Sequence, residues 1–185
     1  MSPFQEEVYK KAFALDEESR NFFTGSRQAS LFAFPDGSYG TQGYSSYVDE
    51  KVGGALTATK TLNISLKPKL AKALQIMEDG NKAVTTAQKL EILGKYSSKY
   101  ATTIKSLLEA YEKGESSFVY SSYVSGGGCI LFSKILEIFG YSKATSSTIT
   151  PGMRYMIVTN KTSTSSEIRN LVTTFNRDKN KHGKI

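Results

Sequence analysis

The sequence has few of the residues that build metal or redox sites. Among its 185 residues there are one cysteine, one histidine and no tryptophan. A single cysteine excludes an intramolecular disulfide and a cysteine metal cluster, and it is typical of a reducing compartment. Because a nucleophilic thiol needs a nearby base, we expect Cys129 to be a small buried hydrophobic residue. His182 lies in a basic tail without ligand partners, so we predict no metal site.

Long apolar runs are missing as well. No stretch of the sequence approaches the roughly 18 apolar residues of a membrane-spanning helix. The N-terminus has no positively charged segment followed by an apolar one, so it does not resemble a secretory signal. We therefore predict no membrane partner.

The motifs that bind ATP and magnesium are absent from the sequence too. No G-x-x-x-x-G-K-[ST] loop is present to surround the phosphates of ATP. No Asp-Glu pair ends an expected strand, because Asp49-Glu50 follows a tyrosine-rich loop and Asp16-Glu17-Glu18 lies in an expected helix. We accordingly assign this chain no catalytic residue and no cofactor.

Positive charge is what the sequence has in excess, with a net charge of +7. From Arg154 to Ile185 there are seven Lys and Arg residues against two acidic ones, so +5 of that charge lies in this segment. A basic imbalance of this kind favours a polyanionic partner such as nucleic acid. A solubilising tail is the alternative interpretation.

The first 114 residues are predicted to be mainly helical, with one irregular loop. Ser2 and Gln5 have capping-box spacing, and the apolar residues that follow share one helical face as far as Leu15, before Gly25 ends the helix. Residues 30–54 contain a Pro-Asp-Gly turn among aromatic residues and are expected to be an ordered, irregular loop. Further helices are expected at 66–77 and from the Thr85-x-x-Gln88 capping box to Gly114, with a break or bend at Gly94.

After Gly114 the pattern changes to α/β. Residues 117–121 and 154–159 are short β-rich runs that we interpret as buried strands, each followed by an apolar-striped helix. The second helix has a Thr164-x-x-Glu167 capping box. Strand, helix, strand, helix is a parallel βαβα unit. Two strands make a poor sheet, so this unit is expected to need more chain after Ile185.

Three segments resemble superfamily 2 helicases of large DNA viruses, among them poxvirus nucleoside triphosphatase I and the small subunit of the poxvirus early transcription factor. FVYSSYVSGGGCILFSKILEIFGYSKA (118–144) resembles the motif IV strand and the helix after it. RYMIVTNKTSTSSEIRNLVTTFN (154–176) resembles the next strand and helix. Ser26-Arg27-Gln28-Ala29-Ser30 before FAFP resembles an element between the two RecA-like domains.

This resemblance implies a domain plan. Residues 1–114 would be the helical and loop region between the RecA-like domains, and 115–185 the N-terminal part of the second one, with an incomplete parallel sheet. Motifs V and VI, which carry further ATP contacts and the arginine finger, would follow Ile185 in the family. The chain is therefore expected to be a fragment of a viral ATP-dependent helicase or translocase linked to transcription, located in the host cytoplasm or the virion.

Two loops are the candidate nucleic-acid contacts, and both follow expected strands. They comprise Ser121, Ser122 and Tyr123, and Thr159, Asn160, Lys161 and Thr162. Ligands bind beyond the carboxyl ends of parallel strands, and hydroxyl groups and a cation suit phosphate. In each case an ordinary polar loop is the alternative. A phosphate site at Gly126-Gly127-Gly128 is weighed against close helix packing, which is favoured because a lone glycine triplet lacks the lysine of a P-loop.

The resemblance also implies partners and leaves alternatives open. Nucleic acid, either DNA or RNA, is the expected partner, with a viral RNA polymerase as a further one. ATP and magnesium would belong to the complete parent. The alternative function is a stand-alone, helicase-derived accessory module that binds nucleic acid or a polymerase subunit. A pure interaction piece, whose basic tail is incidental, is the third.

Overall fold

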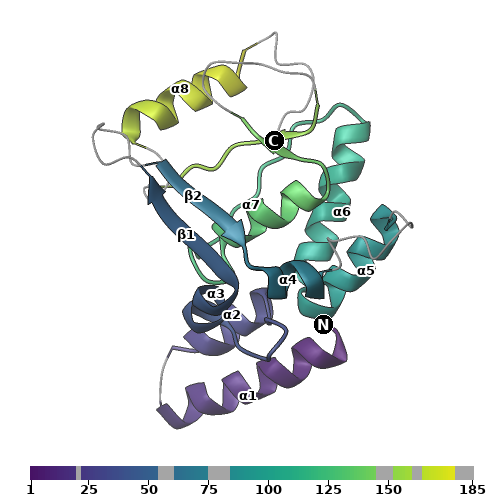
Figure 1. Ribbon diagram of the computed structural model, residues 1–185, viewed down its shortest axis with the longest axis vertical. Helices are drawn as coiled ribbons and strands as arrows, with labels where there is room; N and C mark the ends of the chain where they lie inside the picture. The colour runs from purple at the N-terminus through teal and green to yellow at the C-terminus, as the bar shows by residue number, and fades with distance from the viewer. Residues whose placement is uncertain (20–21, 54–60, 75–83, 145–151, 160–163, 178–185) are drawn as a thin grey trace.

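The computed structural model describes residues 1–19, 22–53, 61–74, 84–144, 152–159 and 164–177. It contains both helices and short strands, which confirms the predicted mixed α/β class. In Figure 1 the N-terminal helices lie at one end of the molecule and the last helix, α8, lies at the other. The main hydrophobic core lies between these two ends.

Two helices, α1 (Pro3–Ser19) and α2 (Thr24–Leu31), form the N-terminal end of the molecule. Ser2 Oγ accepts a hydrogen bond from the backbone N–H of Gln5 at 3.0 Å, which confirms the predicted helix start. The predicted capping box is wrong in its second half, because the Gln5 side chain enters the core. Gly25 was predicted to end α1, but it lies in the first turn of α2.

The C-terminal half of α1 holds α2 through Asp16. The Asp16 carboxylate accepts hydrogen bonds from the backbone N–H groups of Gly25 (3.1 Å) and Ser26 (2.7 Å) at the start of α2. Asp16 is buried, whereas Leu15, which was predicted to lie on the core-facing side, is exposed. A carboxylate suits this position because the N-terminus of a helix has unpaired N–H groups and a positive dipole end.

Residues 30–53, the described part of the predicted irregular loop, are more regular than predicted. They include the helix α3 (Gly40–Tyr47) and the strand β1 (Val48–Gly53), which pairs antiparallel with β2 (Thr61–Leu66). The predicted Pro-Asp-Gly turn is confirmed, with the N–H of Gly37 bonded to the carbonyl of Phe34 at 2.8 Å. Aromatic side chains do hold this segment in place, because they form much of the core.

The helical region that follows contains α4 (Pro68–Ala73), α5 (Thr86–Tyr96) and α6 (Ser98–Glu112). The Thr85 capping box at the start of α5 is confirmed. The predicted break or bend at Gly94 is wrong in its position, because α5 continues through Gly94 and ends at Tyr96, and the break between the two helices lies at Ser97. Ser97 caps α6 through the N–H of Tyr100, and its hydroxyl also donates to the carbonyl of Leu31.

Gln5 links these helices to the N-terminal pair. Its side chain is fully buried. The amide Nε2 donates to the carbonyl groups of Ala29 and Ser30 at 3.2 and 3.1 Å, and Oε1 accepts from the N–H of Ser98 at 3.1 Å. One side chain therefore joins α1, the end of α2 and the start of α6. Buried polar groups that are fully hydrogen-bonded in this way fix the relative position of helices.

The C-terminal part contains α7 (Cys129–Ile138), β3 (Ser142–Lys143), β4 (Arg154–Tyr155) and α8 (Ser165–Phe175). The Thr164 capping box of α8 is confirmed. Strand β3 pairs with β4 in parallel over two residues. The predicted buried strand at 117–121 is wrong, because this segment belongs to no strand or β-bridge in the described part of the chain. The predicted strand at 154–159 is paired at its first two residues.

Candidate ligand groove

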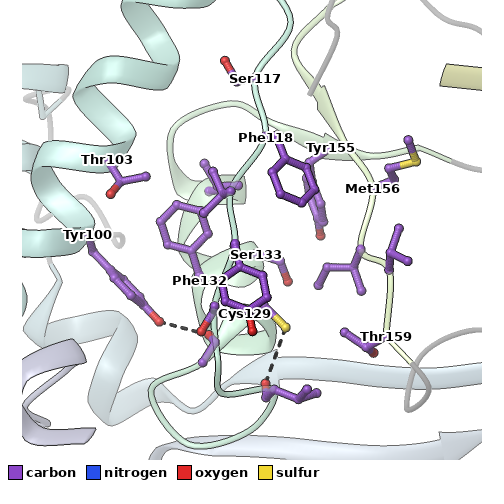
Figure 2. A pocket seen from close by; sticks show the side chains of 18 of the residues that line it. Tyr100, Thr103, Ser117, Phe118, Cys129, Phe132, Ser133, Tyr155, Met156 and Thr159 are labelled. Carbon is purple, nitrogen blue, oxygen red and sulfur yellow. Dashed lines mark hydrogen bonds between the residues drawn. The ribbon is translucent and has the colours of Figure 1, made fainter. Parts of the chain in front are cut away.

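An apolar groove separates the two segments that were predicted to be strands. Residues 116–121 form one wall and residues 155–159 the other, while α7 supplies the floor (Figure 2). Side chains of α6 and α8 complete its sides. Its volume is about 1300 Å³. The groove, defined by these elements, therefore occupies the place where the second RecA-like sheet was expected.

Several large apolar side chains are left in solvent around this groove. Phe118 is 90% exposed and Tyr120 is 78% exposed on one wall, while Val158 is 53% exposed on the other. Val172 of α8 is 42% exposed, and no residue of α8 is buried although its apolar stripe is the one predicted. Single exposed apolar residues are normal on a protein surface, whereas a contiguous group of them often marks an interaction site.

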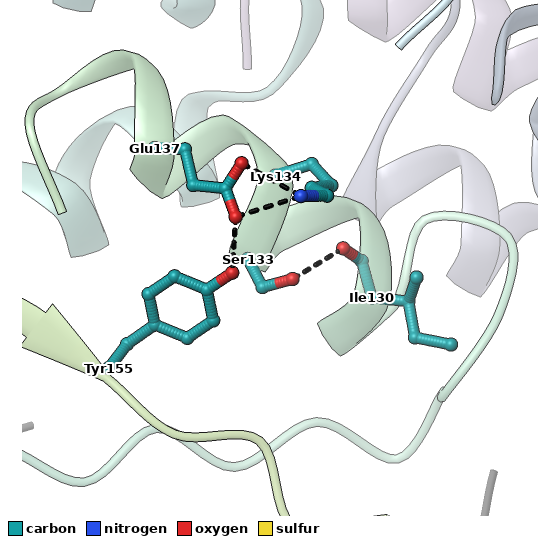
Figure 3. A network of polar contacts seen from close by, with 5 residues as sticks. All are labelled: Ile130, Ser133, Lys134, Glu137 and Tyr155. Atoms are coloured by element: carbon teal, nitrogen blue, oxygen red, sulfur yellow. Dashed lines mark hydrogen bonds and ion pairs between the residues drawn. The ribbon is translucent and has the colours of Figure 1, made fainter. Parts of the chain in front are cut away.

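The floor of the groove is tied to β4 by a polar network (Figure 3). The Tyr155 hydroxyl donates to the Glu137 carboxylate of α7 at 2.6 Å. Lys134 donates to both oxygens of the same carboxylate at 2.8 Å. Burial, together with the negative charge of Glu137, raises the pKa of Tyr155 above its usual value, so the phenol stays a hydrogen-bond donor at neutral pH. One wall of the groove is therefore fixed to its floor.

The glycine triplet packs closely, although Gly128 contributes to the lining of the groove. All three glycines are buried, and Tyr100 on α6 donates to the carbonyl of Gly127 at 2.7 Å. A side chain at Gly127 would meet the Cβ of Phe32 at 3.1 Å. The N–H groups of Cys129 and Ile130, in the first turn of α7, already bond to the carbonyls of the preceding loop. Close packing, the favoured interpretation, is therefore supported over a phosphate site.

The first candidate loop lies at one end of the groove. Ser121 lines the groove, and its hydroxyl donates to the carbonyl of Tyr123 at 2.9 Å. The same carbonyl accepts from the N–H of Cys129 at 3.0 Å, so this loop also caps α7. Ser122 is exposed. Of the three predicted residues, Ser122 is thus presented to solvent, while Ser121 and Tyr123 also support the loop.

The second candidate loop is described only at its first residue. Thr159 is partly buried and lines the groove on the wall opposite Ser121. Asn160, Lys161 and Thr162 lie outside the described residues. The structure therefore places Ser121 and Thr159 on the same groove, and the assignment of the two loops to nucleic acid stays a prediction.

Cys129 lies at the floor of the groove, where the sequence interpretation had placed a small buried residue. The side chain is partly buried, and its thiol lies 3.8 Å from the carbonyl of Val124. Burial raises the pKa of the Cys129 thiol, which makes it a weaker nucleophile at neutral pH.

Sequence reasoning missed the exposed apolar residues of the groove, because it interpreted the 117–121 segment as a buried strand. A signal was present in the sequence itself. Phe118 and Tyr120 alternate with smaller residues, as in a half-buried strand, and the predicted sheet had too few strands to cover them.

Comparison with known proteins gives the relatives of this chain. It is 36% identical over 99% of its length to "Putative helicase 087L" of Invertebrate iridescent virus 3 and 28% identical over 99% to "Putative helicase 009L" of Frog virus 3. It is 32% identical over 77% of its length to "Putative ATP-dependent RNA helicase" of Heliothis virescens ascovirus 3e. The chain is therefore helicase-like, with relatives in large DNA viruses.

This helicase-like chain covers only part of those relatives. It spans 16% of the iridescent virus protein, 14% of the ascovirus protein and 15% of the frog virus protein. No family model matches the chain. No solved structure matches it either. The predicted resemblance to helicases of large DNA viruses is confirmed, whereas the narrower likeness to the two poxvirus proteins stays a prediction.

Within the residues that the structure describes, no helix is both long enough and apolar enough to cross a membrane.

Proposed function

We propose that this chain is a segment of a longer viral helicase-like protein and that it contacts the sugar–phosphate backbone of a single-stranded nucleic acid. The contacts would come from the two candidate loops, at 121–123 and 159–162. The observation that carries this proposal is the similarity of nearly the whole chain to segments of proteins named as helicases.

The chemistry of the two loops supports this assignment. Ser122 presents a hydroxyl to solvent, and Lys161 adds a cation in a segment whose excess positive charge is +5 of the total +7. Hydroxyl and ammonium groups recognise phosphate without reading base sequence. A protein that moves along nucleic acid needs contacts of this kind, because each base is only a temporary neighbour.

The longer protein would belong to superfamily 2 and couple ATP hydrolysis to movement on nucleic acid, in transcription and with a viral RNA polymerase as partner. Residues 115–185 would begin its second RecA-like domain, after the connecting region 1–114. ATP and magnesium would be bound by other segments, because residues 1–185 contain no phosphate-binding loop. The proposal is supported by the relatives' names and by the order of motifs in the sequence.

Binding to fluorescent single-stranded DNA and RNA, followed by anisotropy at several salt concentrations, tests this function. We expect affinity to fall as salt rises, because phosphate binding releases counterions. Lys161→Ala should lower the salt slope by about 0.7, the value for one phosphate contact on a single strand. Comparison of the two nucleic acids decides between DNA and RNA.

Lys10→Ala is the matched control, because Lys10 is an exposed lysine of α1, at the opposite end of the molecule from α8 (Figure 1). Equal losses from the two variants would mean that net charge alone attracts the oligonucleotide, and they would contradict the assigned loops. Binding that does not change with salt would contradict phosphate recognition altogether. Binding to a polymerase subunit in the absence of nucleic acid affinity would favour the accessory-module alternative.

A further inference from the structure

Outside the groove, one surface combines hydroxyl groups with lysines. It is formed by α3 and α4, at the end of the hairpin where β1 begins and β2 ends (Figure 1). Antiparallel pairing of β1 with β2 brings the two helices together, because β1 continues directly from α3 and β2 leads into α4. The N–H of Lys67 before α4 donates to the carbonyl of Tyr47 at the end of α3 at 2.9 Å. The exposed residues of this α3–α4 surface are Thr41, Gln42, Ser45 and Ser46 of α3 and Lys69 and Lys72 of α4.

The exposed side of α3 is polar and has no charged residue. Thr41 and Ser45 lie one helical turn apart, and so do Gln42 and Ser46. All four are exposed, whereas the opposite side of α3 is buried in the core. Hydroxyl and amide groups of this kind bond to phosphate and sugar oxygens without reading the base sequence.

Two lysines of α4 add positive charge beside these hydroxyl groups. Lys69 and Lys72 are exposed and lie one turn apart. The ammonium group of Lys69 is 5.9 Å from the centre of the Tyr47 ring, so it lies next to the end of α3. Asp49 pairs with Lys67 at 3.6 Å. Neither Lys69 nor Lys72 forms an ion pair with a carboxylate of the described residues.

The lysines of α1 are in the opposite situation. Lys10 pairs with Glu6, and Lys11 pairs with Glu7, each at 2.7 Å. In α4, by contrast, two of six residues are lysines and none is acidic. Like charges one turn apart destabilise a helix, and a polyanionic partner would remove this repulsion. The positive charge of α1 is therefore neutralised within the helix, whereas that of α4 is available to a partner.

We propose that the α3–α4 surface binds phosphates of the same single-stranded nucleic acid, as a second site beyond the two candidate loops. The loop that carries Ser122 adjoins this surface, because a Cβ added at Gly126 would lie 3.0 Å from the carbonyl carbon of Gly40 at the start of α3. The eight residues of α3 extend about 12 Å from there toward α4. A strand bound at Ser122 would follow α3 to the lysines of α4. This inference rests on the proposed function.

Nucleic acid fits this surface better than an acidic polypeptide does. Protein–protein interfaces usually have an apolar centre, and no large apolar side chain of α3 or α4 is exposed. Interfaces with nucleic acid are more polar and more positively charged, as the α3–α4 surface is. A protein partner is therefore treated as the contradicting outcome of the test.

Lys69→Gln combined with Lys72→Gln tests the site, because glutamine keeps a helix-forming side chain and removes the charge. Anisotropy of fluorescent oligo(dT) and oligo(U) with the 185-residue chain measures affinity at several salt concentrations. The salt slope should fall by about 1.4, because each phosphate contact on a single strand contributes about 0.7. Over a tenfold range of salt this corresponds to about 25-fold in affinity.

Three further variants separate the site from general charge effects. Lys10→Gln combined with Lys11→Gln removes the same charge from α1 and should change the slope much less. Lys69→Arg combined with Lys72→Arg should bind like the unmodified chain. Ser45→Ala should weaken binding without changing the slope, because a hydroxyl group releases no counterion. Circular dichroism and an unchanged unfolding midpoint verify that each variant is folded.

Equal slopes for the α1 and α4 double variants would overturn the proposal, because net charge alone would then explain binding. Tighter binding of polyglutamate than of either oligonucleotide would overturn it in favour of an acidic protein partner. A reduced slope for Lys161→Ala with an unchanged slope for the α4 variant would overturn this site and leave the proposed function standing. The reverse result would support the α3–α4 surface and contradict the assigned loops.

Discussion

Residues 32–34 (Phe-Ala-Phe) and residues 118–120 (Phe-Val-Tyr) are both an aliphatic residue between two aromatic ones, but they lie in opposite environments. Phe32, Ala33 and Phe34 are completely buried. Their backbone is bonded as well, with the N–H of Ala33 donating to the carbonyl of Tyr96 at 3.0 Å. Phe118, by contrast, is almost fully exposed on the wall of the groove.

The difference between the two tripeptides lies in what surrounds them. The ring of Phe34 contacts Tyr47 and Phe32 at centroid distances of 5.4 and 4.9 Å. Phe32 in turn contacts Tyr96 of α5 and Tyr100 of α6 at 6.4 and 5.5 Å. Around residues 118–120 the described chain supplies a floor and one opposite wall but no neighbouring strand. Apolar composition therefore makes a segment able to be buried, and the available neighbours decide whether it is.

The largest expected effect on stability comes from removing the Phe34 ring, and removal of the Phe118 ring is its comparison. Phe34→Ala should lower the free energy of unfolding by about 3–5 kcal/mol, because it removes buried area and leaves a cavity. Phe118→Ala should change it by no more than about 0.5 kcal/mol, as at other exposed positions. Urea denaturation of the 185-residue chain measures both. Similar losses would mean that residues 118–120 are buried in solution.

A smaller effect is expected from filling the space beside the buried tripeptide. A Cβ added at Gly43 would overlap the Phe34 ring, so Gly43→Ala should destabilise the protein by about 1–3 kcal/mol. Gly94→Ala is the matched control in α5, where the nearest atom to an added Cβ is Ala101 Cβ at 3.9 Å. It should stabilise the protein by about 0.5–1 kcal/mol, because alanine is the better helix former. Thermal unfolding of both variants shows whether each substitution raises or lowers the stability. Destabilisation by both would contradict the packing described.

The position of the buried tripeptide also depends on Gln5, which holds the end of α2 just before Phe32. Gln5→Ala should cost about 1–3 kcal/mol, because it leaves buried carbonyl groups of α2 without a donor. Gln42→Ala, at an exposed position of α3, is the control and should be close to neutral. The midpoints of urea denaturation of the two variants measure this difference in stability. A neutral Gln5→Ala would show that solvent replaces the buried amide.

The smallest expected effect concerns Asp16 at the other end of α2. Burial opposes its ionisation, but the N–H groups of Ser26 and Gly25 hold the pKa of Asp16 below its usual value near 3.8. Its stabilising contribution is therefore present above about pH 4 and lost as pH falls through the lowered pKa. Asp16→Asn should cost about 1 kcal/mol at pH 7, and this difference should shrink at pH 3.

Glu6→Gln is the control for Asp16, since Glu6 is an exposed residue of α1 paired with Lys10. Exposed pairs of this kind contribute little, so its unfolding midpoint should follow that of the unmodified chain at both pH values. A loss for Asp16→Asn that is equally large at pH 3 would mean that packing, and not charge, explains the effect.

Features set by neighbouring residues were predictable from sequence. The capping boxes at Thr85 and Thr164 are formed as predicted, because both partners of each lie within one helical turn. The hairpin of β1 and β2 was missed although Ile64 and Leu66 alternate with polar residues in β2. Its partner strand reads VDEKVG, in which charged residues obscure the alternation.

Features set by distant residues were not predictable. Strand propensity at 117–121 is real, yet pairing needs a neighbour that lies elsewhere in the chain or outside it. The position of Ser121 and Thr159 on one groove was not predicted, because it depends on how two segments far apart in the sequence pack over α7. The hydrogen bond from the Ser121 hydroxyl to the Tyr123 carbonyl depends on the local turn, and no pattern in the sequence predicted it.

Amide hydrogen exchange of the 185-residue chain tests the contrast between the two tripeptides most directly. The amides of Ala33 and Phe34 should be strongly protected, because they donate to the carbonyls of Tyr96 and Ser38 inside the core. The amides of residues 118–120 should exchange at close to the rate of an unstructured peptide. Comparable protection of both segments would mean that residues 118–120 are already paired in this chain, and it would contradict an open groove.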